Sequence, residues 1–491
     1  MIAKSKDHEP IPQVSFTFNL KKTILGAFDA GRVTGIGGMP LIREIDDEMR
    51  LTEQIVERLP EHRLRPEKAI HSQEVLIRQS IYQRSAGFED TNDADVLRFD
   101  PALKVACGRN PDSSRDLASQ ESLFRLEDAP TAAVNESLQD LLPELFIQTF
   151  ERAPGIVEMD MDSTCDPVHG NQEKTGYNGY YGTSCYTPLL MHSDGFPLVA
   201  RLRPGKAGRA DDGLKMLQRV HTRLKKEWAN TKFLFRADNG FAVPEIYRFC
   251  EKEDITYLIC YAATSAIKTE PEVKAAVEKA RLEFIQLFGE PVKLKDDERR
   301  KQQDRILHST KEEGRQQETF EQSERKVRVC TELMYKSDSW AKNDNARRMI
   351  LRLDYTDEGP DYMLVVTNYQ GGDPKWLYEE KYCRRGQAEN WIKEQKALKC
   401  DRLSCQKFNA NQFRLLLHTF AYILVRAIRN LMPKEQANIS IQAVQERFIK
   451  IGAMVKESAR QIWFHWSSWH PWQYDFRRVL IRLRATSNTP Q

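Results

Sequence analysis

The sequence predicts a mixed α/β protein that is long enough for several structural units. Its 491 residues are 40% hydrophobic and 30% charged, a composition that can bury large cores and is unlike that of a disordered chain. Residues 151–264 switch between strand-like and helix-like hydrophobic periods, whereas residues 1–150 are mainly helical in pattern. A long charged stretch interrupts the pattern before helices return at 375–432. These observations together predict an α/β core that carries an insertion and follows a helical region.

The first 150 residues form the first predicted unit. Residues 1–30 lack a persistent period and are expected to form an extended arm. Helical patterns begin near Leu51, recur at 66–84 and start again after Ser119, a residue type common at helix N-caps. Such a unit could read DNA, but a bundle that only packs on the next unit is the alternative, because no recognition-helix signature is legible.

Residues 151–264 open with three predicted strands. Residues 156–162 alternate between apolar and acidic side chains, which is typical of a strand. An Asp-Gly pair between two apolar runs, 186–192 and 197–202, predicts a hairpin. The elements that follow are a helix at 214–228, a strand at 233–235, a helix at 244–253 and a strand at 255–261. The resulting order, βββαβαβ, is that of the ribonuclease-H-like fold.

Residues 265–374 are predicted to be an insertion, because this segment exceeds any connection that a compact domain needs. Its start is expected to form a long solvated helix, and residues 293–326 are nearly all charged or amide residues. Residues 349–368 are expected to be strand-rich. Helices at 375–432 then complete the α/β core.

Residues 433–491 form a basic, aromatic-rich C-terminal region. It holds four of the eight tryptophans: Trp463, Trp466, Trp469 and Trp472. We expect a packed hairpin that covers a sheet, with stacking on nucleobases as the alternative. His465 and His470 are expected to be structural and not metal ligands.

Charge is distributed unevenly along the chain. Residues 381–491 hold 20 Lys and Arg against 7 Asp and Glu, whereas the first 380 residues hold 54 against 64. The basic end could face a polyanion, and the alternative is that its cations only solvate helix faces.

Two features bear on the compartment. Nine cysteines, an odd number without a C-x-x-C pair, predict a reduced intracellular protein without a zinc site. The first residues lack the apolar core of a secretion signal, and the longest apolar stretch, 415–425, is too short to span a membrane. We therefore expect a soluble protein.

Acidic residues follow two of the predicted strands. Asp162 ends the first strand and Asp238 ends the fourth, so neighbouring strands could bring both carboxylates together. Carboxylate oxygens suit hard divalent cations, and a two-metal site for phosphodiester chemistry needs about three such ligands. Strand parity places Asp160 on the same face as Asp162, so parity leaves either residue as the ligand.

Glu389 is the candidate for the third ligand. At about 100° per residue, one face of a helix would carry a stripe of five side chains: Tyr382, Arg385, Glu389, Lys393 and Lys396. The opposite face, expected to pack on the sheet, carries Ala388, Trp391 and Leu398. A carboxylate flanked by an aromatic ring and three cations suits a metal ligand among phosphate clamps. The alternative is an ordinary amphipathic helix with i,i+4 salt bridges.

The spacing Tyr382-x2-Arg385-x3-Glu389-x6-Lys396 resembles the Y-R-E-K signature of DDE transposases from bacterial insertion sequences. Other runs resemble motifs of the DDE group 1 transposase family: Asp-Ser-Thr at 162–164, where Ser replaces the family's Gly, Arg-Ala-Asp-Asn-Gly-Phe at 236–241, Val-Val-Thr-Asn at 365–368, and Asp-Arg-Leu-Ser-Cys at 401–405. The resemblance extends from about residue 87 to residue 426.

This resemblance implies a transposase that binds the terminal inverted repeats of an insertion sequence and catalyses Mg²⁺-dependent DNA cleavage and strand transfer. Asp162, Asp238 and Glu389 would be the catalytic residues and would hold two Mg²⁺ ions, for which Mn²⁺ could substitute. The side chains implied to contact DNA phosphates are Tyr382, Arg385, Lys393 and Lys396. Trp340 would stack on a base extruded at the cleaved end, with packing inside the insertion as the alternative.

The resemblance also implies roles for the regions and the partners. Residues 1–150 would bind DNA or dimerise, 151–264 and 375–432 would form the ribonuclease-H-like catalytic core, and 265–374 would be a mostly β insertion. The partners would be double-stranded DNA of the element ends and of the target, and a second copy in a homodimer, with no membrane. The protein would act in the bacterial cytoplasm at the nucleoid. Alternatives are a ribonuclease-H-like nuclease without strand transfer and a catalytically silent DNA-binding protein, against which the intact acidic triad argues.

Overall fold

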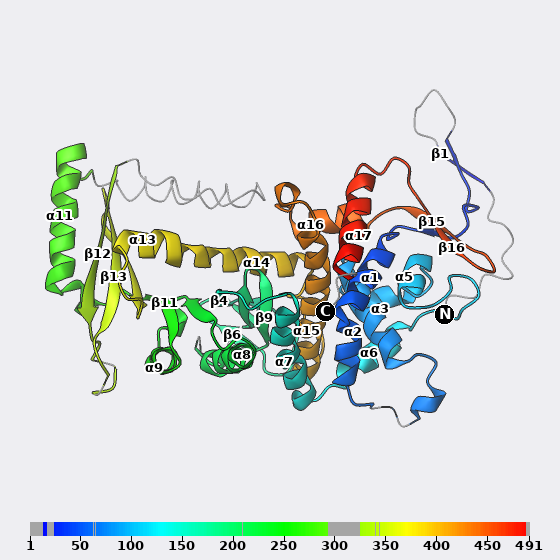
Figure 1. Ribbon diagram of the computed structural model, residues 1–491, viewed down its shortest axis with the longest axis horizontal. Helices are drawn as coiled ribbons and strands as arrows, with labels where there is room; N and C mark the ends of the chain where they lie inside the picture. Colours follow the sequence, from blue (N-terminus) through cyan, green and yellow to red (C-terminus); the bar gives the residue numbers. More distant parts are fainter. Residues whose placement is uncertain are drawn as a thin grey trace.

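The computed structural model describes residues 13–16, 24–292 and 325–487, apart from positions 62, 64, 209, 339 and 343. Figure 1 shows an elongated molecule with a large sheet in one half, helices of the N-terminal region in the other, and helix α15 (Phe408–Asn430) between them. Most of the charged run at 293–326 lies outside the described residues, as does much of the predicted N-terminal arm.

Eight strands form one mixed sheet, in the order β12-β13-β14-β11-β10-β4-β8-β9. Their bounds are β4 (Ile156–Ser163), β8 (Leu189–Ser193), β9 (Phe196–Arg201), β10 (Lys232–Ala237), β11 (Ile255–Tyr261), β12 (Lys326–Tyr335), β13 (Arg347–Thr356) and β14 (Gly359–Thr367). Strand β10 pairs in parallel with both β4 and β11. Helices α8 (Gly213–Glu227) and α9 (Pro244–Lys252) precede β10 and β11. The predicted βββαβαβ order is confirmed, and a small sheet of β5 (Asp166–Pro167), β6 (Gly176–Asn178) and β7 (Thr183–Tyr186) is added between β4 and β8.

The β8–β9 hairpin turns at the predicted Asp-Gly pair. Asp194 (φ 46°) and Gly195 (φ 76°) both adopt left-handed backbone conformations, which is the geometry of a type I′ turn. A Cβ at Gly195 would lie 2.9 Å from the indole nitrogen of Trp391, so glycine also allows a close approach here. The turn sets the pairing of β8 with β9, and β8 pairs antiparallel with β4, where Asp162 lies opposite Leu190.

The insertion extends the large sheet. Strand β14 pairs antiparallel with β11, and β13 and β12 add two more strands at this edge. The Val-Val-Thr-Asn run closes the junction: Thr367 donates a hydrogen bond to the carbonyl of Tyr257 (2.6 Å), and the Asn368 side chain donates to the carbonyl of Ile255 (2.9 Å). Two helices, α10 (Ser265–Lys268) and α11 (Pro271–Phe288), precede these strands, and α11 packs on β12 and β13. The predicted helical start and strand-rich part of the insertion are both confirmed.

The N-terminal region is mainly helical, as predicted. Its helices are α1 (Met39–Met49), α2 (Leu51–Glu57), α3 (Gln73–Ser85), α4 (Ala94–Leu97), α5 (Pro101–Ala106), α6 (Gln120–Asp128) and α7 (Ala132–Gln148). Ser119 stands at the N-cap of α6, although its side chain makes no capping hydrogen bond. Two short exposed strands, β1 (Val14–Phe16) and β2 (Ile24–Gly26), pair within the predicted arm.

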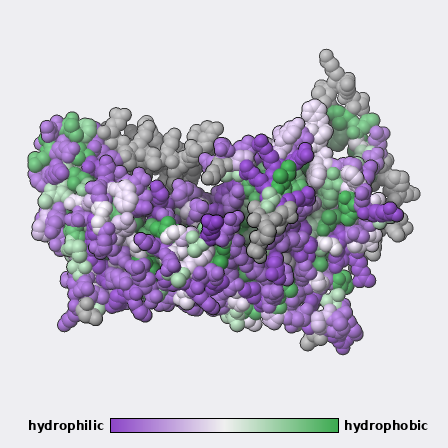
Figure 2. Space-filling model, viewed as in Figure 1, coloured by the Kyte–Doolittle hydropathy of each residue, from purple (hydrophilic) through white to green (hydrophobic). Residues whose placement is uncertain are grey.

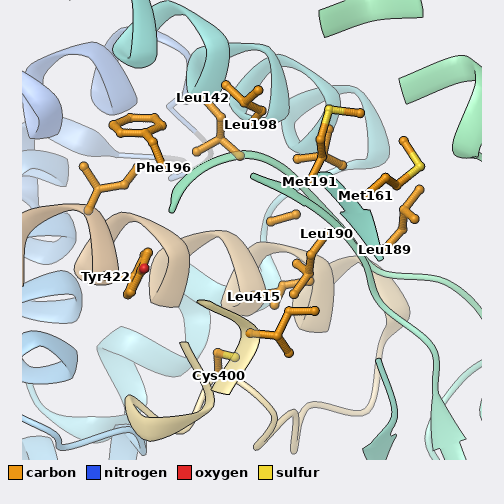
Figure 3. Packing of buried hydrophobic residues seen from close by; sticks show 14 of the residues in the cluster. Leu142, Met161, Leu189, Leu190, Met191, Phe196, Leu198, Cys400, Leu415 and Tyr422 are labelled. Atoms are coloured by element: carbon orange, nitrogen blue, oxygen red, sulfur yellow. The ribbon is translucent and has the colours of Figure 1, made fainter. Parts of the chain in front are cut away.

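Helix α15 joins the two halves because it is buried almost all round. It packs on α3, α6 and α7 of the N-terminal region and on β9 of the sheet. Figure 3 shows Leu415 of this helix beside Leu190 of the hairpin. The apolar run at 415–425 therefore serves this internal contact. Across the described part of the chain, every helix is too short or too polar to cross a lipid bilayer.

The C-terminal region forms the predicted hairpin, but its aromatic side chains are only partly packed. Strands β15 (Ala453–Glu457) and β16 (Ile462–Trp466) join β3 (Val33–Thr34) in a small sheet, flanked by α16 (Ile441–Val444) and α17 (Gln473–Ser487). Trp466 donates to the carbonyl of Gly37 (2.8 Å), whereas Trp463 and Trp469 are exposed. Figure 2 shows apolar surface at this end of the molecule, where β1 and the hairpin lie.

Candidate active site

Asp162 and Asp238 lie side by side at the ends of two parallel strands. Ala237, the last residue of β10, pairs with Met161 of β4, so the next residue on each strand is one of these aspartates. Neighbouring strands are about 4.8 Å apart. The Asp162 carboxylate accepts a hydrogen bond from the backbone of Ser163 (2.9 Å), and that of Asp238 accepts one from the backbone of Gly240 (2.9 Å). Both carboxylates are thus oriented by the turns that follow their strands.

Asp160 differs from Asp162 in having a structural partner. Arg236 of β10 donates to both oxygens of Asp160, at 2.6 and 2.8 Å, and to Glu158 at 2.8 Å. The same guanidinium donates to the carbonyl of Lys381 (2.9 Å), so this buried network ties the sheet to the helix that crosses it. Asp160 is occupied in holding Arg236, whereas Asp162 faces the other acidic residues.

Glu389 reaches the site from a long helix that runs along the sheet (Figure 1). The helix comprises α13 (Pro374–Trp376), a π-helical part η4 (Leu377–Tyr382), a tight turn η5 (Cys383–Gly386) and α14 (Gln387–Ala397). Two contacts hold α14 in place: Glu394 pairs with Arg429 of α15 (2.9 Å), and the Gln395 amide lies 2.8 Å from a ring nitrogen of His192 on β8. Ala388 is buried against the sheet and Glu389 is exposed.

Arg385 links two of the three carboxylates. Its Nη2 donates to Asp162 Oδ2 at 2.7 Å, and its Nη1 lies 3.7 Å from Glu389 Oε1. Among the described residues, no three side chains of His, Cys, Asp or Glu are already arranged around one point as metal ligands are. A guanidinium therefore supplies the positive charge beside Asp162 in this conformation.

The acidic residues influence one another electrostatically. Burial raises the pKa of Asp162 to about 6; the nearby Arg385 opposes this effect, and the negative charges of Asp238 and Glu389 add to it. Three neighbouring carboxylates with one arginine leave net negative charge at a partly desolvated site. An all-oxygen donor set of this kind fits a hard divalent cation.

This environment makes the stability of the metal-free protein depend on pH. An unfolded aspartate has a pKa of about 3.9, so a folded value near 6 means that the folded state binds the Asp162 proton more tightly. The resulting stabilisation is present below pH 4 and is lost as the pH rises through 6. We expect wild type to lose up to about 3 kcal/mol relative to Asp162→Asn between pH 4 and pH 8.

Urea denaturation in the presence of a chelator measures this difference. The difference in the free energy of unfolding between the two proteins should appear above pH 5. It should disappear again when a divalent cation is added, because only wild type gains a full set of carboxylate ligands. A difference in the free energy of unfolding that stays constant from pH 4 to pH 8 would refute the raised pKa of Asp162.

The predicted phosphate-contacting residues occupy different environments. Tyr382 is buried and stacks on Tyr378, and its phenol interacts electrostatically with Arg385 and Asp238. Lys396 donates to the carbonyl of Cys165 (2.7 Å) and lies 3.1 Å from the buried Asp166. Lys393 is exposed on the outer side of α14.

Trp340 is enclosed between the insertion and the core. Its side chain is 6% exposed and contacts the rings of Tyr247, Tyr261 and Tyr335, while Arg347 lies over its face at 4.8 Å. These contacts agree with the alternative that Trp340 packs inside the protein, except that two of its ring partners, Tyr247 and Tyr261, belong to the core and not to the insertion. In this conformation the indole has no free face for a nucleobase.

Sequence reasoning missed several residues that shape the site. Arg236 appeared only as part of a motif, yet it fixes Asp160 and the crossing helix. Asp166, four residues after Asp162, is the ion-pair partner of Lys396. The sequence also contained a signal for a further hairpin, because three tyrosines and three glycines lie close together in 176–182. These residues form a hairpin beside the carboxylates.

Comparison with known proteins gives the family. The transposase DDE domain group 1 model matches residues 16–488, which is nearly the whole chain. No curated protein matches the chain. Among solved structures, the chain is similar to a piggyBac transposase in a synaptic complex with hairpin DNA, at 9% identity, with a TM-score of 0.37 and coverage of 92% of this chain and 80% of that one. The family model spans the acidic residues and both flanking regions, so the chain belongs to the transposase DDE domain group 1 family.

Proposed function

We propose that this transposase binds the two ends of its mobile element as duplex DNA and catalyses their cleavage and transfer into a target, with Asp162, Asp238 and Glu389 as catalytic residues. The observation that supports the proposal is that Arg385 contacts Asp162 of β4 and Glu389 of α14, while Asp238 follows the neighbouring strand β10 at the level of Asp162. Members of the family generally use divalent metal ions. The three carboxylates would hold two Mg²⁺ ions, which supply an activated water or 3′-hydroxyl and neutralise charge on the phosphodiester.

Arg385 is the residue of this chain best placed to contact the scissile phosphate. It is half-buried between Asp162 and Glu389, and a guanidinium can donate two parallel hydrogen bonds to phosphate oxygens as it does to a carboxylate. We infer that Arg385 exchanges Asp162 for phosphate when the carboxylate charge is neutralised. Lys393, exposed on the same helix, would add a contact to the DNA backbone further out.

Three residues have supporting roles in this proposal. Lys396 holds the loop after Asp162 through Cys165 and Asp166, so it would reach phosphate only by leaving these partners. Tyr382 and Trp340 are buried and would position the helix and the insertion. We also propose that two copies of the chain act together, because joining two DNA ends to one target requires two sites.

The proposal is tested with the DNA that flanks the coding sequence in its natural setting. Labelled end fragments, a supercoiled target plasmid and Mg²⁺ are incubated with the wild-type protein, and the products are separated on denaturing gels. We expect cleavage at the element ends and joined products that require the metal. Cleavage without joining would favour a ribonuclease-H-like nuclease, and binding without cleavage would favour a silent DNA-binding protein; either result would overturn the proposal.

A further inference from the structure

A hairpin beside the carboxylates carries exposed aromatic side chains. It comprises β6, β7 and the tip between them, and we name it the tyrosine hairpin (176–186). Tyr180 is 72% exposed and Tyr181 is 37% exposed, and their rings meet edge to face with centroids 4.9 Å apart. Tyr177, on β6, is also exposed. Rings that remain this exposed add little to the stability of the fold, and they can take part in an external contact.

The tip of the tyrosine hairpin is held in one conformation by its own hydrogen bonds. The Asn178 side chain accepts from the backbone of Tyr180 (3.0 Å) and donates to the carbonyl of Gly205 (2.9 Å). Gly182 donates to the carbonyl of Asn178 (2.9 Å) and adopts a left-handed conformation at φ 66°. The pair of rings is therefore presented on a fixed base, which lowers the entropy lost when a ligand binds.

The tyrosine hairpin lies next to the candidate catalytic residues. Strand β5, which begins four residues after Asp162, pairs with β7, and Asp166 lies opposite Tyr186. Burial, followed by the charges of Cys165 and Asp162, raises the pKa of Tyr181 to about 12, and Asp238 contributes as well. The phenol of Tyr181 is thus close enough to sense both aspartates, and it stays protonated and able to donate.

Positive charge flanks the base of the tyrosine hairpin. Lys174 precedes β6 and Lys206 packs along Gly176, where the nearest Lys206 carbon would lie 3.0 Å from an added Cβ. Both lysines are exposed. Aromatic rings with adjacent cations are the combination that binds unpaired nucleotides, in which bases stack on the rings and the cations contact the backbone.

We propose that Tyr180 and Tyr181 stack on unpaired nucleobases of the DNA strand next to the phosphodiester held at the three carboxylates. This inference rests on the proposed function, since it names the part of the DNA substrate that the site receives. Trp340 is enclosed and cannot take this role in the present conformation, whereas the rings of Tyr180 and Tyr181 are 72% and 37% exposed.

The test uses end duplexes with 2-aminopurine placed in turn at the nucleotides flanking the cleavage position. Wild type, Tyr180→Phe/Tyr181→Phe and Tyr180→Ala/Tyr181→Ala are compared, with Tyr474→Ala in helix α17 as the control for loss of an exposed tyrosine. We expect wild type, the phenylalanine variant and the control to change the fluorescence at the same one or two positions. The alanine variant should lose this signal and cleave roughly 10–100-fold more slowly, corresponding to about 1.4–2.7 kcal/mol of lost stacking.

A second substrate separates stacking from a structural effect. With mismatched, already unpaired flanking bases, the alanine variant should recover part of its cleavage rate, because less energy is needed to open the strand. An alanine variant with wild-type fluorescence and wild-type cleavage would overturn the inference and leave the proposed function standing. Wild-type protein that binds the duplex but never cleaves it would overturn the proposed function and this inference together.

Discussion

Glu389→Gln is expected to abolish cleavage and joining while leaving the fold and DNA binding intact. Glu389 is exposed and lies 3.7 Å from Arg385, so the substitution removes a charge without disturbing the core. Metal ions contribute several kcal/mol of charge stabilisation in such reactions, and each 1.4 kcal/mol corresponds to a factor of ten. We therefore expect the cleavage rate to fall by at least about a thousandfold, measured with labelled end fragments in single-turnover assays.

A matched control is available on the same helix. Glu380 is exposed and lies 3.6 Å from Arg384 in a surface pair, so Glu380→Gln makes the same chemical change away from the carboxylates. It should cleave within about twofold of wild type, because exposed pairs contribute little. Similar rates for the two variants would remove Glu389 from the reaction.

Glu127→Gln is expected to lower the free energy of unfolding by about 3–5 kcal/mol, because it leaves buried positive charge without its counterion. Glu127 on α6 accepts from Arg84 of α3 at 2.5 Å, and Arg414 of α15 lies 3.7 Å from its other oxygen. All three side chains are almost fully buried. This cluster connects the N-terminal helices to the helix that packs on the sheet, so the two halves should unfold together.

The neighbouring residue provides the comparison. Asp128 pairs with Lys407 in an exposed salt bridge at 2.6 Å, and Asp128→Asn should change the free energy of unfolding by less than about 1 kcal/mol. Urea denaturation followed by circular dichroism measures both variants. A small effect of Glu127→Gln would mean that water reaches this cluster, and that the N-terminal helices are less firmly attached than the structure indicates.

Much of the core fold could be predicted because each element carries a local signal. The alternating residues of β4 and the Asp-Gly turn between β8 and β9 depend only on nearby sequence. The pairing of β14 with β11 could not be read in this way, because it depends on contacts between segments about 100 residues apart. For that reason the insertion was expected as a separate region, and its strands instead extend the large sheet.

The candidate site follows the same division. The positions of Asp162 and Asp238 at strand ends were predicted from the hydrophobic pattern alone. Asp160 differs from Asp162 because it pairs with Arg236 of the neighbouring strand. The alternation of residues along a single strand could not predict this ion pair. A helical wheel likewise assumes one uniform period, so the π-helical part before Glu389 and the burial of Tyr382 could not be anticipated.

Asp162, Asp238 and Glu389 together should hold divalent cations. A crystal structure of the protein with end DNA and Mn²⁺, using the anomalous signal of manganese, would locate these ions. We expect manganese within about 2.0–2.6 Å of oxygens from all three residues, with Arg385 moved from Asp162 to a DNA phosphate. Manganese bound elsewhere, with Arg385 still paired to Asp162 while DNA occupies the site, would contradict it.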